Sequence, residues 1–177
     1  RYCEILDEVA KFVSKNTSWY PIQKDFELNS QKLKLFMDPP YNYKYMGKGF
    51  CEDAKNADFF QNNDGFAMAA VWSLRGLRFI KLMIEELRGK EEQSMGSIPE
   101  KCYDKTLKNH HGFMTRTVSS GILKLVSLSD LPAWKTFGFH DAYSSKVYIQ
   151  SLYEKITVAE FNVTMFLKVH KIDEVLF

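Results

Sequence analysis

Apolar residues recur mainly at intervals of three and four along this chain, rather than at intervals of two. That spacing places them on one face of an α-helix, so the pattern predicts helix almost throughout. The predicted helices span residues 3–14, 22–37, 65–88, 97–128 and 141–169, with a short helix that opens at 129–132 and runs through Trp134. The sequence therefore predicts an all-α fold.

Residues that favour helix ends stand at several of these boundaries. Pro21 suits the first turn of a helix, where its missing N–H costs nothing, and Asp38-Pro39-Pro40 ends that helix. Asp64 is a candidate N-cap for the helix over 65–88, and Gly89 is its candidate terminating glycine. These signals support the long helices that the periodicity predicts.

Two further stretches complete the prediction. Ser97-Ile98-Pro99-Glu100 has the pattern of a capping box, and it predicts the start of one continuous helix that reaches Leu128. Residues 38–63 carry the weakest helical signal, with several prolines, glycines and polar runs. There we expect a loop with one short helix near residues 51–60.

Composition narrows the class of protein. The 177 residues suit a single domain over 1–177, and the net charge of +2 is small for a protein whose main role is to neutralise nucleic-acid phosphates. No run of about 18 apolar residues is present, so we predict no membrane-spanning helix. Aromatic residues make up 15% of the chain, which fits either an aromatic core or the lining of an apolar cavity.

The cysteines indicate a reducing compartment. Cys3, Cys51 and Cys102 are odd in number and widely spaced, which fits free thiols better than a disulfide framework. We therefore expect a cytoplasmic protein.

Motifs of enzyme chemistry are missing from the sequence. It contains no phosphate-binding loop, no nucleophile elbow and no paired metal-ligand spacing. His110 and His111 are adjacent, so on a helix they would point about 100° apart and could not bind one ion together. We predict no catalytic residues, no metal and no cofactor.

One polar stripe combines three kinds of hydrogen-bonding group. Asp25, Asn29 and Lys32 stand at i, i+4 and i+7, which is one face of a helix. Together they offer a carboxylate, an amide and an ammonium group, a set suited to a ligand with many hydroxyls and an amide. A solvated surface is the alternative interpretation of this stripe.

Two apolar stripes each contain one unusual residue. Trp72, Gly76, Phe79 and Met83 share a helix face, where the glycine suggests close approach of a backbone or a ligand and the tryptophan offers a flat surface to a sugar ring. His111 stands at the head of a second stripe, with Thr115, Val118, Ile122 and Leu125. A buried core tryptophan beside a helix crossing, and a hydrogen-bonded core histidine, are the alternatives.

Together these segments resemble the glycolipid transfer protein family. Residues 20–32 look like its Asp-x3-Asn-x2-Lys headgroup motif, residues 72–80 like its tryptophan helix, and residues 103–113 like its histidine helix. The resemblance is good over residues 19–37 and 65–128 and weaker through the C-terminal helix. It implies a two-layer all-α fold with a lipid pocket between the layers, which carries one glycosphingolipid between membranes.

The resemblance also implies roles for individual residues. Asp25 would accept the N–H of the ceramide amide, His111 would hydrogen-bond its carbonyl, Asn29 and Lys32 would hold sugar hydroxyls, and Trp72 would stack on the first sugar. The acyl chains would lie in an apolar pocket lined by Ile22, Met68, Phe79, Met83, Leu107 and Val118.

Four positions refine this expectation. Relatives that carry ceramide-1-phosphate resemble this chain but have Lys at the Asn29 position and Arg at the Trp72 position, so the residues here favour a sugar. Phe113 stands where the family's membrane-touching aromatic is usually Trp, and Ser119 where a large apolar pocket residue is expected. We expect Phe113 to contact the membrane and the hydrocarbon pocket to differ in shape near Ser119.

The leading hypothesis is a monomeric, non-enzymatic glycosphingolipid carrier that touches membranes transiently. Three alternatives remain open: a carrier of ceramide-1-phosphate, a lipid sensor or adaptor with little transfer activity, and a helical interaction domain that binds no lipid. A transfer assay across a panel of headgroups separates the first two of these from the leading hypothesis.

Overall fold

The computed structural model describes residues 1–38, 49 and 65–169, and in these ranges the regular elements are helices. The elements are α1 (Tyr2–Val13), η1 (Thr17–Trp19), α2 (Tyr20–Met37), α4 (Phe66–Leu87), α5 (Ile98–Thr106), η2 (Lys108–His110), α6 (Phe113–Ser127), α7 (Ala133–Thr136) and α8 (Ala142–Val169), where η marks a short 3-10 turn. The predicted all-α fold is confirmed. The short helix predicted near residues 51–60 and the predicted cap at Asp64 lie outside the described residues.

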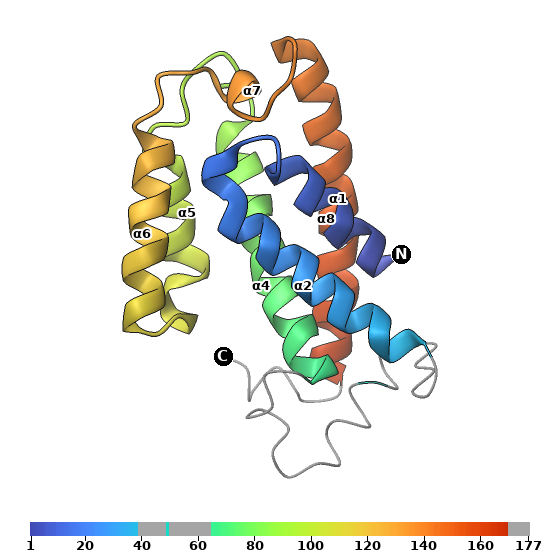
Figure 1. The fold of residues 1–177 in the computed structure, drawn as a ribbon. Helices are drawn as coiled ribbons and strands as arrows, with labels where there is room; N and C mark the ends of the chain where they lie inside the picture. Colours follow the sequence, from blue (N-terminus) through green and yellow to red (C-terminus); the bar gives the residue numbers. More distant parts are fainter. Residues whose placement is uncertain (39–48, 50–64, 170–177) are drawn as a thin grey trace.

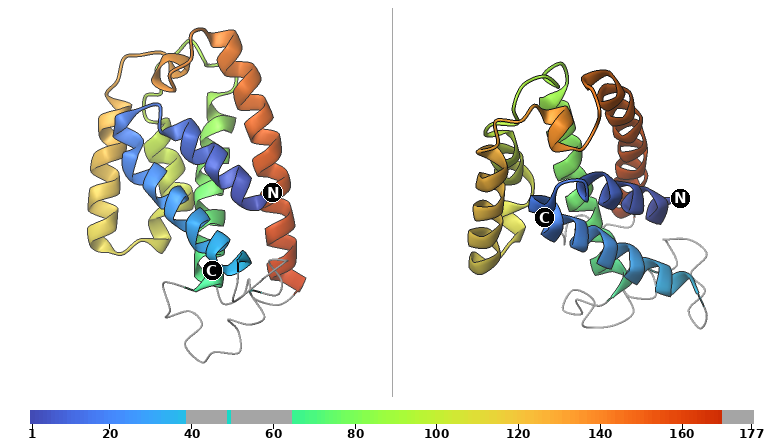
Figure 2. Two further views of the ribbon diagram at one scale, coloured as in Figure 1. Left: turned by 45° about the vertical axis from the view of Figure 1, so that its right-hand side comes forward. Right: turned by 45° about the horizontal axis from the view of Figure 1, so that its top comes forward.

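The helices form two layers (Figures 1 and 2). α6, α2 and α1 lie in the front layer of Figure 1, and α5, α4 and α8 lie behind them. Contacts of α2 with α4, of α1 with α8 and of α5 with α6 join the layers. α4 is the central helix of the rear layer, and its buried residues lie on nearly every side, because neighbours cover it from both flanks and from the front.

Close packing of α2 on α4 depends on Gly76. A Cβ atom at this position would lie 2.9 Å from Cζ of Phe26, inside van der Waals contact. The sequence suggested that a backbone or a ligand approaches Gly76, but in the structure the approaching group is an aromatic side chain from α2. The glycine lets α2 and α4 cross closely at the point where both helices also border a cavity.

Polar contacts attach α8 to α4. Arg78 Nε lies 3.1 Å from one carboxylate oxygen of Glu160, and Lys81 Nζ lies 2.8 Å from the other. The Arg78 guanidinium also donates to the hydroxyl of Thr164 at 2.9 Å. Arg78 is thus a residue through which α4 and α8 contact each other.

Most of the aromatic residues fill the core. Phe12 and Phe137 stack with ring centroids 4.4 Å apart, and Trp19, which is fully buried, packs against Phe137 and Phe79. The two interpretations of the aromatic content are therefore both correct in part, because Phe79 also forms part of the wall of the cavity described below.

Helix ends agree with several predictions from the sequence. α2 begins at Tyr20 with Pro21 in its first turn, and α4 ends at Leu87, followed by Gly89 with a φ of +75°. Asp141 caps α8, because its carboxylate accepts a hydrogen bond from the backbone N–H of Ser144 at 2.7 Å. These residues set the lengths of the long helices.

The prediction of one continuous helix from residue 97 to 128 is wrong. α5 ends at Thr106, η2 follows, and His111 adopts an extended backbone (φ −93°, ψ 138°) before α6 begins at Phe113. Gly112, a poor helix former, precedes α6 with an extended backbone (φ −67°, ψ 169°). Ser97 does cap α5 by position, but its side chain makes no capping hydrogen bond, so the predicted capping box does not form. α5 and α6 instead lie side by side as a helical hairpin (Figure 2).

Candidate functional site

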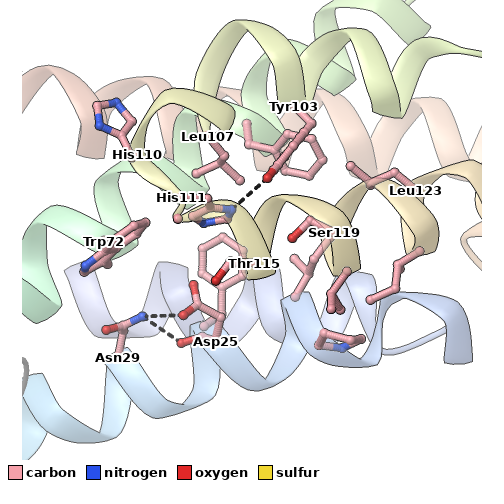
Figure 3. A pocket seen from close by; sticks show the side chains of 18 of the residues that line it. Asp25, Asn29, Trp72, Tyr103, Leu107, His110, His111, Thr115, Ser119 and Leu123 are labelled. Carbon is pink, nitrogen blue, oxygen red and sulfur yellow. Dashed lines mark hydrogen bonds between the residues drawn. The ribbon is translucent and has the colours of Figure 1, made fainter.

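A cavity of about 690 Å³ opens between the two layers, where α2 and α6 diverge. Its walls come from α2, α4, the α5–α6 hairpin and the segment that joins the two helices of that hairpin. Figure 3 shows its side chains converging from these separate parts of the chain. The residues that line it are Pro21, Ile22, Asp25, Phe26, Asn29, Lys32, Met68, Trp72, Gly76, Phe79, Tyr103, Leu107, His110, His111, Gly112, Met114, Thr115, Val118, Ser119, Ile122 and Leu123.

All five residues expected at a headgroup site border this one cavity. Asp25, Asn29 and Lys32 come from successive turns of α2, Trp72 from α4, and His111 from the break before α6. His111 therefore does not head a helical stripe, as the sequence predicted, but the extended backbone before α6 still brings it to the cavity.

Asp25 and Asn29 form a local pair on α2. The Asn29 amide donates to the backbone carbonyl of Asp25 at 2.9 Å and to its carboxylate at 3.1 Å (Figure 3). Asn29 is buried, whereas the Asp25 side chain remains accessible from the open cavity. The pKa of Asp25 is raised because the surrounding protein replaces water, and the Asn29 hydrogen bond and the charge of Lys32 oppose that rise.

His111 is held by two aromatic neighbours. Its Nδ1 lies 2.9 Å from the hydroxyl of Tyr103, and its ring stacks on the Trp72 indole with centroids 5.4 Å apart. The pKa of His111 is lowered, first by burial and then by the positive charges of His110, Arg75 and Arg116. The imidazole is therefore neutral at pH 7, which leaves one nitrogen as a donor and the other as an acceptor.

The Trp72 indole has a cation beside it as well. The guanidinium carbon of Arg75, one turn along α4, lies 4.9 Å from the centroid of the Trp72 ring. An arginine over an indole is an attractive arrangement, and together with His111 it fixes the orientation of the ring at the cavity.

Five of the six residues expected in a hydrocarbon pocket also line the cavity. They are Ile22, Met68, Phe79, Leu107 and Val118. The prediction that Met83 lines the pocket is wrong. Met83 lies one helical turn beyond Phe79 on α4, where it is fully buried in the core and does not line the cavity. The helical spacing was right, but the wall formed by α4 stops at Phe79.

Phe113 lies outside the cavity. It occupies the first turn of α6 and is 84% exposed, next to Met114, which is also exposed. Two large apolar side chains thus stand free at the end of the α5–α6 hairpin, adjacent to Gly112 and His111 at the cavity wall.

Sequence reasoning missed two important members of the wall. Tyr103 lies eight residues before His111, on the other side of the break between α5 and α6, and its hydroxyl contacts the His111 imidazole. Phe26 could have been found as the residue one turn after Ile22, on the same face of α2.

Within the described ranges, the structure was also compared with the requirements of a membrane-spanning helix and of a metal site. No helix there is long and apolar enough to span a bilayer. Those same residues also contain no group of three or more His, Cys, Asp or Glu side chains arranged to hold a metal ion.

A family model described as glycolipid transfer protein matches residues 1–130, which include every residue that lines the cavity and the break at His111. The chain belongs to the glycolipid transfer protein family. Members of this family are lipid transfer proteins and not enzymes, in agreement with the prediction of a non-enzymatic protein. α7 and α8 lie beyond the matched residues.

One curated relative in this family is distantly related to the chain. The chain is similar to glycolipid transfer protein 3 from Arabidopsis thaliana, with 25% identity over 126 residues, which are 71% of this chain and 53% of the relative. The chain therefore spans about half the length of the curated relative that it matches.

Solved structures share the fold. Mouse ceramide-1-phosphate transfer protein in its apo form has a TM-score of 0.73 at 14% identity, over 92% of this chain and 82% of that one. FAPP2, which is described as selecting simple glycosphingolipids with its glycolipid transfer protein fold, has a TM-score of 0.69 at 21% identity. The match covers 94% of this chain and 82% of that one. HET-C2, a fungal glycolipid transfer protein, has a TM-score of 0.68 at 18% identity, and the match covers 96% of this chain and 82% of that one.

Proposed function

We propose that this chain is a non-enzymatic lipid carrier that extracts one glycosphingolipid from a membrane and delivers it to another. The observation that carries the proposal is the single cavity that joins a polar rim, containing Asp25, Asn29, Lys32, Trp72 and His111, to an apolar interior. Each buried CH₂ group contributes about 0.8 kcal/mol, so a two-chain lipid leaves a bilayer only if the protein offers comparable apolar surroundings.

The polar rim suits both halves of a ceramide amide. The Asp25 carboxylate accepts the amide N–H. The neutral His111 donates to the amide carbonyl through Nε2, because we assign the Tyr103 hydroxyl as donor to Nδ1, which places the ring proton on the other nitrogen. A buried amide with either half unpaired would cost about 1–3 kcal/mol, so both residues are needed.

The remaining rim residues favour a sugar as the headgroup. Asn29 and Lys32 offer hydrogen bonds to hydroxyls beside Asp25, and the Trp72 indole offers an aromatic surface at the same rim. Asn29 and Trp72 are both neutral, whereas a phosphate headgroup would favour cations that pair with it. Ceramide-1-phosphate is the alternative cargo.

We also propose that the whole chain works as one monomeric unit that meets membranes through Phe113. The contacts of α8 with α4 support a single domain over 1–177, because they join the part beyond residue 130 to the central helix. The exposure of Phe113 beside the cavity supports membrane contact at the point where a lipid would enter.

Transfer of labelled glucosylceramide between donor and acceptor vesicles tests the proposal. We expect Asp25→Val and Trp72→Ala each to abolish transfer while the helical circular dichroism signal is retained, because the cavity wall and not the core is changed. Asp130→Val, at an exposed position outside the cavity, is the control and should transfer normally. Normal transfer by both rim variants would refute the proposal, and transfer of ceramide-1-phosphate in place of glucosylceramide would select the alternative cargo.

A further inference from the structure

Two hydroxyl groups lie among apolar residues on the α6 wall of the cavity, one on an exposed residue, Thr115, and one on a half-buried residue, Ser119. Thr115 and Ser119 stand one turn apart on α6, and both line the cavity (Figure 3). Their neighbours on the wall are apolar, including Val118 and Ile122 from the same helix and Ile22 from α2. Ser119 is also the position where a large apolar residue was expected from the sequence.

These hydroxyls differ from others on the same helix. Thr117 donates its hydroxyl to the carbonyl of Phe113 at 3.1 Å, and Ser127 donates to the carbonyl of Leu123 at 3.0 Å. Serine and threonine in helices commonly bond back one turn in this way. In the part of the chain that the structure describes, no hydrogen bond is recorded for the side chains of Thr115 and Ser119. Each therefore offers a donor and an acceptor to whatever fills the cavity.

The position of the two hydroxyls relates them to the amide. This step rests on the proposed function, in which Asp25 and His111 hold the two halves of that amide. Thr115 follows His111 by four residues, and Ser119 lies about 6 Å farther along α6, about one helical turn farther from His111. The first carbons of an acyl chain beyond the amide would therefore pass along this strip of α6.

An ordinary acyl chain is a poor match for such a strip. Its CH₂ groups would displace water from both hydroxyls and would replace none of the lost hydrogen bonds. A chain that carries its own hydroxyl on the carbon next to the carbonyl would restore them. We propose that Thr115 and Ser119 select sphingolipids with an acyl chain hydroxylated next to the amide.

The experiment compares two glucosylceramides of equal chain length, with and without a 2-hydroxyl on the acyl chain. Affinities come from competition with a labelled glucosylceramide. For the wild-type chain we expect the hydroxylated lipid to bind roughly fivefold more tightly, which corresponds to about one net hydrogen bond. In Thr115→Val/Ser119→Ala the ratio of the two affinities should fall to about one, because the wall keeps nearly the same shape and loses its hydroxyls.

Thr117→Val is the matched control. It makes the same kind of substitution on the same helix, at an exposed hydroxyl that already has a backbone partner and lies off the cavity wall. This variant should keep the wild-type ratio, and circular dichroism verifies folding of every variant.

Each other outcome has a distinct meaning. Equal affinity of the wild-type chain for both lipids overturns the hydroxyl selection while the carrier function stands. If the double variant keeps the preference for the hydroxylated lipid, the proposed selection by Thr115 and Ser119 is also overturned, since other residues must then bind the acyl-chain hydroxyl. Failure to bind either lipid overturns the carrier function itself, and with it this inference.

Discussion

At the scale of single residues, Asp25 illustrates a conflict between stability and binding. Burial raises the pKa of its carboxyl above the usual 3.8, so the folded chain holds the charged form at a cost. Above the folded pKa this cost is present in full, and below pH 3.8 it is gone, because the group is then protonated in both the folded and the unfolded state. In the proposed function, the same carboxylate charge accepts the N–H of the lipid amide.

Asp25→Asn is therefore expected to increase the free energy of unfolding at pH 7, since it removes a carboxylate whose raised pKa makes the charged form unfavourable in the folded state, and keeps the shape of the side chain. The gain should shrink as the pH falls toward 4. Urea denaturation at the two pH values measures it. The same variant should lose glycolipid transfer, and a variant less stable than wild type at pH 7 would contradict the argument.

His111 works at the same scale in the opposite sense. Its lowered pKa keeps the imidazole neutral in the folded state, so its contribution favours folding above the ordinary histidine pKa of 6.5 and is lost as the pH falls through the lower folded value. Tyr103 and Trp72 hold this neutral ring in place. The pair Asp25 and His111 thus presents an acceptor and a donor in the same pH range.

At the scale of helices, the sequence predicted most of the structure from periodicity and end signals. α1, α2, α4 and α8 follow the predicted ranges within about two residues, apart from ends that fall on undescribed residues. The break between α5 and α6 was missed because the apolar spacing continues across it, and a glycine with two histidines carries little local signal. Met83 was misplaced for a related reason, because a helical face extends past the point where a cavity ends.

The attachment of α8 to α4 allows a prediction at this scale. Glu160 accepts from both Arg78 and Lys81, and all three side chains are 20–23% exposed. Glu160→Gln should lower the free energy of unfolding by about 1–2 kcal/mol, because two partly buried cations then face a neutral group.

Chemical denaturation measures this change. Glu8→Gln is the control, because Glu8 pairs with Lys155 at a more exposed site and should cost less than about 0.5 kcal/mol. Equal losses in the two variants would mean that the Glu160 pairings contribute no more than an ordinary surface ion pair.

At the scale of the whole molecule, the cavity and the exposed aromatic side chain lie at the same end of the α5–α6 hairpin. Phe113 and Met114 project from the first turn of α6, and Gly112 and Met114 also border the cavity. A membrane that receives Phe113 would therefore meet the protein beside the opening that its lipid must enter.

Phe113→Ala should reduce vesicle binding and transfer by roughly tenfold. Insertion of an aromatic side chain into a membrane contributes about 1.5–3 kcal/mol, and Met114, which remains in the variant, would retain part of the binding free energy. Because Phe113 is 84% exposed, the melting temperature should not change. Vesicle sedimentation and transfer assays measure the effect. Leu125→Ala, at an exposed position farther along α6, should bind vesicles normally, and an equal loss there would indicate non-specific adhesion.

α6 itself is weakly anchored. Its buried side chains are Leu123 and Val126, both in its second half, so no side chain in the first turns of the helix is buried, and several of them border the cavity. A hydrocarbon chain in that space would supply the packing that the polypeptide leaves out. The cargo would then act as the last layer of the core, and the loaded protein would be the more rigid and heat-resistant form.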